Sequence, residues 1–181
     1  MGTLRYAILG LLNRRSMSGY EMSKEFESTL FEFWNARHSQ IYPELKLLTE
    51  EGMVTYAIEI SGSILEKKIY SITDAGREAF LQWEMERPQL SPVPKDEFRL
   101  RLFFSSCLSK EDRLALLEDQ LEKHRERLSH LKERLEKFDV LPPEEDGEFS
   151  DYLVLSGALS REEGNCQWLE QCIQLCRERG N

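Results

Sequence analysis

The apolar positions of the first residues recur at the spacing of a helix. Leu4, Ala7, Ile8, Leu11 and Leu12 lie three or four residues apart, which predicts a first helix that ends near residues 13–15. A second helix, from about residue 19 to residue 30, is predicted by the pair Ser18 and Glu21. In a capping box the serine hydroxyl accepts from the backbone N–H three residues on, and the glutamate accepts from the serine N–H.

A third helix is predicted to be capped by Ser39, with Pro43 in its first turn, where a missing N–H costs little. Its buried stripe consists of Ile41, Leu45 and Leu48. Gly52 is able to end it in the left-handed conformation.

Two runs rich in β-branched and aromatic residues follow, at 53–60 and 65–72, and residues 61–63 form the turn between them. Thr73 caps the next helix. The inner face of that helix is predicted from four residues, Ala75, Ala79, Phe80 and Trp83. A helix followed at once by a two-stranded hairpin is typical of a winged helix-turn-helix, which makes DNA binding the leading hypothesis.

The second half of the chain is predicted to be helical. Residues 91–94 read Ser-Pro-Val-Pro, a stiff joint that separates predicted domains at 1–88 and 95–181.

A long helix that begins near Ser109 carries a regular heptad seam, in which His124 occupies a d position. The apolar members of the seam are Leu114, Leu117, Leu121, Leu128, Leu131, Leu135 and Phe138. Such a seam indicates either dimerisation or packing against helices of the same subunit, and the two are compatible. We expect His124 at an edge of the seam, although a polar residue there could also fix register or respond to pH. The sequence leaves open whether the last helix, about 149–177, is continuous through Gly157.

Composition and charge change this picture little. The chain has 181 residues and a net charge of −9, from 24 Lys+Arg and 33 Asp+Glu. Residues 1–88 hold 10 basic and 13 acidic residues, net −3, and residues 89–181 hold 14 and 20, net −6. Because charges are screened over about 10 Å at 0.1 M salt, the location of the basic residues matters more than the total. They gather on the segments expected to face DNA, at Arg37, His38, Lys46, Lys67 and Lys68.

Several other classes of protein are not favoured. The apolar run at residues 6–12 is too short to span a bilayer and no cleavage site follows it, so we expect a cytoplasmic protein without a membrane partner.

Cys172 and Cys176 lie one helical turn apart, with Cys166 nearby, and could bind metal or sense oxidants. No second ligand pair stands at a metal-like spacing, so we prefer packing and expect no cofactor. The sequence has no phosphate-binding glycine loop, nucleophile elbow or HExxH motif, and we expect no enzyme.

The chemistry of the predicted recognition helix assigns roles to its outward residues. Ser39 and Gln40 lie near its N-terminus, where side chains reach base edges, and glutamine can pair bidentately with adenine, a contact worth about 1–3 kcal/mol. Tyr42 would contact a base or a phosphate, and Tyr20 on the preceding helix could donate to the backbone. Phosphate neutralisation, which fixes register without reading sequence, is expected from Lys46, Lys67 and Lys68. The alternative for each is a solvated surface residue.

The chain resembles the PadR family of bacterial transcriptional regulators. The matching residues in the first half are Gly19-Tyr20-Glu21, Gln40-Ile41-Tyr42-Pro43, Leu45, Leu48, Gly52, Lys68, Tyr70, Ile72-Thr73, Ala75-Gly76 and Trp83. The second half is similar to the helical dimerisation region of the longer members, through Phe103-Phe104, the heptad helix and Trp168-Leu169. Many members carry Gly-Arg-Pro at the wing tip, where this chain reads Ser63-Ile64-Leu65-Glu66. The wing therefore lacks that arginine, while the two lysines remain available for phosphates.

The resemblance implies a homodimeric repressor or activator that binds an inverted repeat, and some members respond to phenolic acids. We expect a mainly α fold with a small β-hairpin: an N-terminal winged helix-turn-helix and a C-terminal antiparallel, coiled-coil dimerisation domain. The predicted function is a sequence-specific regulator, a repressor, that binds double-stranded operator DNA as a homodimer and is released by a small aromatic effector. The residues predicted to form the dimer are the apolar seam residues together with Trp168 and Leu169.

Two alternatives remain open at this point. One is a sensor whose main surface is an aromatic pocket at the dimer interface, supplied by Trp34, Trp83, Trp168, Phe98 and Phe103. The other is a winged helix used only for protein association. The outward-facing Gln40, Lys46 and wing lysines count against the second, because an association surface is expected to be more apolar.

Overall fold

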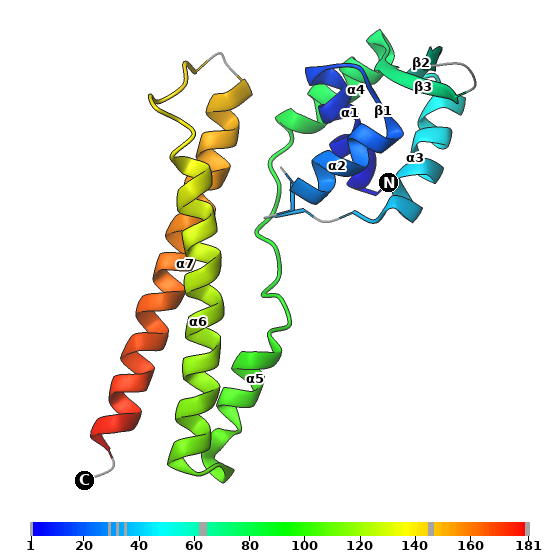
Figure 1. The fold of residues 1–181 in the computed structure, drawn as a ribbon. Coiled ribbons are helices and arrows are strands. Elements are labelled where there is room, and N and C mark those ends of the chain that lie inside the picture. Colours follow the sequence, from blue (N-terminus) through cyan, green and yellow to red (C-terminus); the bar gives the residue numbers. More distant parts are fainter. Residues whose placement is uncertain are drawn as a thin grey trace. The chain divides into compact units, whose positions relative to one another are not determined.

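The computed structural model describes residues 2–28, 30–31, 33–34, 36–61, 65–144 and 147–179. The chain divides into two units, Met1–Leu90 and Ser91–Asn181 (Figure 1). The predicted fold class is confirmed: the chain is mostly helical and has one small antiparallel sheet. Within the described ranges, no helix is both long and apolar enough to cross a membrane.

The described residues of the N-terminal unit form four helices, α1 (Leu4–Arg14), α2 (Gly19–Ser28), α3 (His38–Glu50) and α4 (Asp74–Met85). The predicted capping box at the start of α2 is present. The Ser18 N–H donates to the Glu21 carboxylate at 2.8 Å, and the Glu21 N–H donates to the Ser18 hydroxyl at 3.2 Å. The core is formed by the inner faces of the first three helices with the adjoining strands, through Ile8, Leu12, Met17, Met22, Phe26, Ile41, Leu45, Leu48, Val54 and Tyr70.

The sheet has three strands rather than the predicted two. The hairpin strands β2 (Val54–Ser61) and β3 (Leu65–Ile72) pair in antiparallel register, and β1 (Met17–Ser18) pairs with the other edge of β3. Strand β1 was not predicted, because two residues are too few to show an alternating pattern. Residues 62–64, which include most of the predicted turn, lie outside the described residues. The effect of β1 is to tie the start of α2 to the wing.

Two details of the predicted elements are wrong. The third helix begins at His38 rather than after a Ser39 cap, and its first turn is closed by the Gln40 side chain, which accepts from the Arg37 N–H at 3.0 Å. In α4, Ala75 is exposed and Gly76 is buried instead. A Cβ at Gly76 would lie 2.1 Å from the Met53 carbonyl oxygen, so only glycine fits there. The Thr73 cap of α4 and the left-handed Gly52, at φ +72°, are as predicted.

The C-terminal unit consists of α5 (Glu97–Phe103), a 3₁₀ turn η1 (Ser105–Cys107), α6 (Lys110–Leu135) and α7 (Gly147–Glu178). The last two run antiparallel, side by side (Figure 1), and α7 is continuous through Gly157. The heptad seam of α6 packs against α7 of the same chain, which corresponds to the same-subunit alternative. Its buried members are Leu117, Leu121 and Leu131, which meet Leu155, Ala158, Cys166, Leu169 and Ile173.

His124 is partly exposed, as expected at an edge of this seam, but it is also paired across the two helices. Its Nδ1 lies 2.5 Å from a carboxylate oxygen of Glu162, which is 2% exposed, and its Nε2 lies 3.2 Å from the Gln120 amide. The other Glu162 oxygen lies 3.7 Å from Arg127. A polar cluster therefore occupies a position that the heptad pattern assigns to the apolar seam, and it fixes which residues of α6 and α7 face each other.

Candidate nucleic-acid interface

The exposed side of α3 is set by the burial of its other side. Ile41, Leu45 and Leu48 are fully buried, which turns a second set of side chains to solvent: His38, Ser39, Gln40, Tyr42 and Lys46. All five were predicted from the sequence to contact DNA and all five are exposed, with His38, Tyr42 and Lys46 four residues apart along one side of the helix. Arg37, just before the helix, is exposed as well. An exposed polar helix side next to a hairpin that carries two lysines has the composition expected for a surface that contacts a DNA groove.

Tyr42 is held in place by two neighbours. Its ring lies 4.5 Å from that of His38, centroid to centroid, and it covers Gly19 at the start of α2. A Cβ at Gly19 would lie 2.8 Å from the Tyr42 ring, so the close approach of α2 and α3 requires glycine. Sequence reasoning treated Gly19 only as part of a motif. Its role in positioning Tyr42 depends on a contact between α2 and α3, which no local sequence pattern reveals.

Gln40 has a structural role in addition to its predicted one. Its side-chain oxygen closes the first turn of α3 by accepting from the Arg37 N–H. For the amide to pair with a base, this bond must be exchanged for one to water or to DNA. Because the whole site is exposed, the exchange leaves no buried donor unsatisfied and its cost is small.

The two wing lysines lie on opposite faces of the hairpin, because successive side chains of a strand alternate. Lys68 shares a face with Tyr56 and Tyr70, and its ammonium lies 4.2 Å from the centroid of the Tyr56 ring. Burial, and the proximity of Tyr42 to a lesser extent, raise the pKa of Tyr70, which keeps that phenol protonated. Lys68 is therefore on the side of the hairpin that faces α3.

Lys67 points the other way and meets Glu21, whose carboxylate lies 3.4 Å from its ammonium. Hydrogen bonds from the Ser18 hydroxyl and N–H, with a smaller contribution from Lys67, lower the pKa of Glu21 to about 2. Glu21 is thus charged at any pH at which the protein would bind DNA. The sequence assigned this residue to the cap alone, and its contact with the wing was missed.

The remaining basic and aromatic residues of this surface are less constrained. Lys46 pairs with Glu50 one turn along at 3.7 Å, and both side chains are mostly exposed, so the pair is easily broken. Tyr20 is 60% exposed, and the Lys24 ammonium lies 4.8 Å from its ring centroid. The phenol of Tyr20 is accessible for the hydrogen bond predicted from the sequence.

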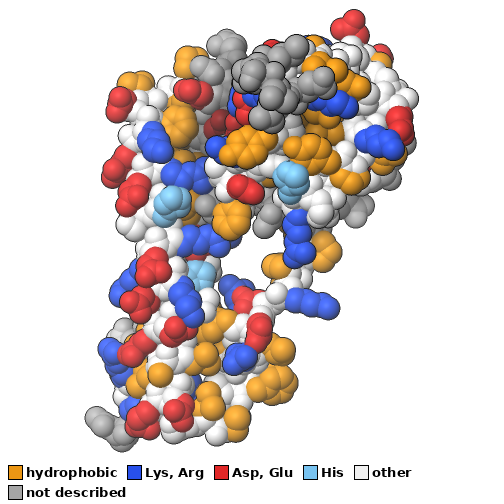
Figure 2. Space-filling view, turned by 45° about the vertical axis from the view of Figure 1, so that its right-hand side comes forward, with side chains coloured by type: hydrophobic (Ala, Val, Ile, Leu, Met, Phe, Trp, Pro, Cys, Tyr) orange, Lys and Arg blue, Asp and Glu red, His pale blue; other side chains and the backbone are white. Residues whose placement is uncertain are grey.

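The residues predicted to form the dimer are divided by the structure. Leu117, Leu121, Leu131 and Leu169 are buried between α6 and α7 of one chain, so their side chains stabilise the helix pair and are not available to a partner. Leu114, Leu128, Leu135, Phe138 and Trp168 are half-buried beside them. Exposed apolar side chains of this unit include Leu100, Phe103 and Phe104, on α5 and directly after it, and Leu153, Val154 and Leu175 on α7. Figure 2 shows hydrophobic side chains gathered over the lower part of this unit, where α5 lies.

The five aromatic residues predicted to share a pocket do not all belong to one unit. Trp34 and Trp83 lie in the N-terminal unit, where Trp83 stacks on Tyr6 with centroids 4.9 Å apart. Phe98 and Trp168 meet edge to face in the C-terminal unit, at 6.2 Å, while Phe103 is 79% exposed. Each aromatic pair contributes to the packing of its own unit.

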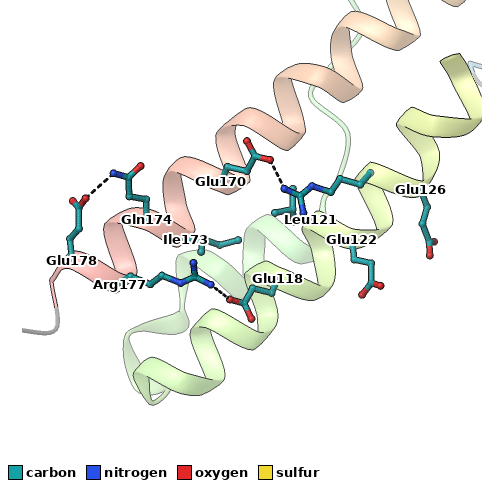
Figure 3. Close-up of a pocket in the computed structure, with 10 residues that line it drawn as sticks. Glu118, Leu121, Glu122, Glu126, Glu170, Ile173, Gln174, Arg177 and Glu178 are labelled. Carbon is teal, nitrogen blue, oxygen red and sulfur yellow. Dashed lines mark hydrogen bonds and ion pairs between the residues drawn. The ribbon is translucent and has the colours of Figure 1, made fainter.

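The surface between α6 and α7 near the C-terminus forms an open groove with a floor of Leu121 and Ile173 (Figure 3). Its rim is charged and paired across the helices: Arg125 donates to Glu170 and Arg177 to Glu118, each at 2.6 Å. These ion pairs bridge the groove. They hold the helices together rather than leaving charges directed at a ligand.

The three cysteines of α7, Cys166, Cys172 and Cys176, pack as apolar residues, whereas Cys107 is exposed. Burial raises the pKa of both Cys166 and Cys172, which disfavours the reactive thiolate. No cluster of three metal-ligating side chains occurs within the described part of the chain.

Comparison with known proteins places this geometry in a family. Residues 8–82 match the Transcriptional regulator PadR-like family, and residues 94–177 match the Virulence activator alpha C-term family. The chain is 42% identical to the Negative transcriptional regulator PadR of Bacillus subtilis (strain 168), over 97% of this chain and 98% of that protein.

Solved structures agree with the sequence comparison. The crystal structure of Bacillus subtilis PadR in complex with operator DNA superposes with a TM-score of 0.92, at 41% identity, over 97% of this chain and 99% of that one. The structure of the same protein in complex with p-coumaric acid gives a TM-score of 0.85 at 39% identity, over the same shares of the two chains. The resemblance noted in the sequence is confirmed, and the chain belongs to the PadR family of transcriptional regulators.

Proposed function

We propose that this protein is a sequence-specific repressor that binds an inverted-repeat operator as a homodimer and is released by a phenolic acid. The observation that carries the proposal is the polar face of α3, which gathers His38, Ser39, Gln40, Tyr42 and Lys46 beside the wing. A relative 42% identical over nearly its full length is a negative transcriptional regulator, and its solved complexes contain operator DNA and p-coumaric acid. A regulator of this kind acts in the cytoplasm, and we propose no enzymatic activity for it.

In the proposed complex α3 enters the major groove with its N-terminal end toward the bases. Ser39 and Gln40 read base edges there, and Tyr42, held by Gly19, contacts a base or the neighbouring phosphate. Phosphates on either side are neutralised by Lys46 from α3 and Lys68 from the wing, and Arg37, His38 and Tyr20 border the same surface. One winged helix covers few base pairs, so two copies on paired half-sites are needed for specificity.

The proposed dimer contact differs from the one predicted from the heptad pattern. The seam buries three of its leucines within one chain, and we assign the contact with a second copy to the exposed and neighbouring Leu100, Phe103 and Phe104. Exposed apolar side chains that are close together commonly mark a protein–protein contact. Seam residues then act on dimerisation indirectly, by holding α6 and α7 in place.

The decisive experiment is fluorescence anisotropy with the upstream region of the gene's own operon, compared with a scrambled duplex at two salt concentrations. We expect the protein to bind the upstream fragment more tightly than the scrambled duplex. Its affinity for both duplexes should fall with salt, and p-coumaric acid should release the upstream fragment. Equal weak binding to both duplexes would contradict sequence-specific recognition. Binding that p-coumaric acid leaves unchanged would contradict the effector alone.

A matched pair of variants separates base reading from phosphate binding. Gln40→Ala is expected to weaken the operator complex by about 1–3 kcal/mol and to change the scrambled duplex little. Lys68→Ala is expected to weaken both duplexes and to reduce the salt dependence. Equal losses on both duplexes for Gln40→Ala would remove that residue from base recognition.

A further inference from the structure

The two adjacent wing lysines have opposite electrostatic surroundings. In the register of the hairpin, Lys67 stands opposite Glu59 and Lys68 stands opposite Ile58. Directly opposed side chains have Cβ atoms about 4.5–5.5 Å apart, so Lys67 lies beside one carboxylate on its own sheet. Glu21 supplies a second, at 3.4 Å from the Lys67 ammonium. Lys68 instead lies over the Tyr56 ring, with no acidic residue opposite.

The carboxylate that meets Lys67 is held in a fixed position. Its Oε2 accepts from the Ser18 hydroxyl at 2.6 Å and from the Ser18 N–H at 2.8 Å, which leaves Oε1 directed at Lys67. Ser18 is 3% exposed and belongs to β1, whose partner strand β3 also carries Lys67. Both members of the pair are therefore positioned by the same sheet, in contrast to the mobile, exposed pair of Lys46 and Glu50.

Resting on the proposed function, we propose that Glu21 is a specificity-determining residue that withholds Lys67 from DNA phosphates. Lys67 and Glu21 together carry no net charge. When the pair approaches the DNA phosphates, few of the counterions condensed on the DNA are therefore released. For Lys67 to bind a phosphate it must leave Glu21, whose fixed negative charge then lies beside the DNA. The wing presents Lys68 as its phosphate contact, and the protein gains less of the binding that is independent of sequence.

The sequence predicts that Lys67 and Lys68 each contact a phosphate. The ion pair with Glu21 changes this role for Lys67. In the described part of the structure, Lys67 is paired with a carboxylate of α2, whereas Lys68 lies over a tyrosine ring. Because non-specific binding is almost entirely electrostatic, the number of available lysines sets the affinity for competing genomic DNA.

The test uses the full-length protein and a scrambled duplex, with affinity measured by anisotropy from 50 to 200 mM salt. Lys67→Gln and Lys68→Gln are a matched pair. Loss of one phosphate contact lowers the slope of log affinity against log salt by about 0.9, which corresponds to about a 3.5-fold change over this salt range. We expect this loss for Lys68→Gln and a much smaller one for Lys67→Gln.

Glu21→Gln provides the opposite change. Glutamine at this position of a capping box still accepts from the Ser18 N–H, so the start of α2 is retained, as a circular dichroism melt would verify. Freeing Lys67 is expected to steepen the slope by about 0.9, and the double variant Glu21→Gln/Lys67→Gln is expected to return to the wild-type slope. The control is Glu27→Gln, which removes an exposed carboxylate from the same helix and measures the general effect of one negative charge.

Three outcomes would overturn the inference. Lys67→Gln could lower the slope as much as Lys68→Gln does, Glu21→Gln could change it no more than Glu27→Gln, or neither lysine could affect it. The first comparison does not depend on Glu21→Gln folding correctly. Preference of the wild-type protein for its operator is measured in parallel: its absence contradicts the proposed function, whereas unchanged slopes with that preference intact contradict only the role of Glu21.

Discussion

Helices α3 and α6 both carry a regular apolar stripe, yet the two helices differ in the function of the side that the stripe leaves exposed. The stripe of α3 buries Ile41, Leu45 and Leu48 in its own unit, and the rest of the helix is a polar surface suited to DNA. The heptad of α6 resembles a dimer seam, but its buried members also pack within the chain, against α7. An apolar period thus predicts which face is buried and does not identify the partner.

The largest expected effect tests this difference directly. Leu117 is fully buried between α6 and α7, so Leu117→Ala is expected to destabilise the C-terminal unit by about 2–5 kcal/mol at any protein concentration. Leu175→Ala, at a 56% exposed position of α7, is the control and should cost little. Urea unfolding at two protein concentrations provides the measurement. A loss that vanished when the protein was diluted to monomer would mean that the seam leucine acts between subunits after all.

A second, smaller effect concerns the polar cluster within that seam. Glu162→Ala removes the buried carboxylate that accepts from His124 and lies near Arg127. The His124 and Arg127 side chains are 21% and 44% exposed, so both can turn to water, and the expected loss of unfolding free energy is that of a hydrogen bond to a charged group, about 1.5–3 kcal/mol. Glu163→Ala, next in sequence and paired with Lys132 at the surface, should cost much less. Similar losses for the two variants would show that the cluster contributes no more than a surface ion pair.

Local chemistry predicted those parts of the fold that depend on a few neighbouring residues. The Ser18–Glu21 capping box, the Thr73 cap and the left-handed Gly52 all follow from side chains within four positions of one another. The N-cap of α3 was misplaced by two residues, at Ser39 instead of Arg37, because Gln40 closes the first turn from inside the helix and Ser39 is of the more usual capping type.

Contacts between distant segments were not predictable in the same way. Glu162 meets His124 across 38 positions, and this depends on the register of α6 against α7. The contact of Glu21 with Lys67 likewise requires β1, a strand too short to predict. The sequence could have predicted that Lys67 and Lys68 lie on opposite faces of the hairpin, because successive side chains alternate along a strand.

Gly19 offers a test of how the recognition surface is positioned. A methyl group there would lie 2.8 Å from the Tyr42 ring, so Gly19→Ala is expected to displace the ring and to weaken operator binding about tenfold, or about 1.4 kcal/mol. Gly157→Ala is the matched control, because nothing lies within 4 Å of its added methyl group. That variant should bind DNA normally and be slightly more stable, by up to about 1 kcal/mol. Unchanged operator affinity in Gly19→Ala would mean that Tyr42 takes no part in recognition.

The smallest expected effect is the pH dependence that Glu21 confers on the N-terminal unit. Its pKa is lowered from 4.5 to about 2 in the folded protein, chiefly by the hydrogen bonds from Ser18. A depressed carboxylate pKa stabilises the fold fully above the unfolded value of 4.5 and progressively less as the pH falls toward 2. The advantage of the wild-type protein over Glu21→Gln should therefore shrink between pH 5 and pH 2.5, which melts of both proteins would measure. Because the Glu21 side chain is 37% exposed, solvent screening keeps the difference small. A constant difference across this range would show that Glu21 has an ordinary pKa and that Ser18 does not hold its carboxylate toward Lys67.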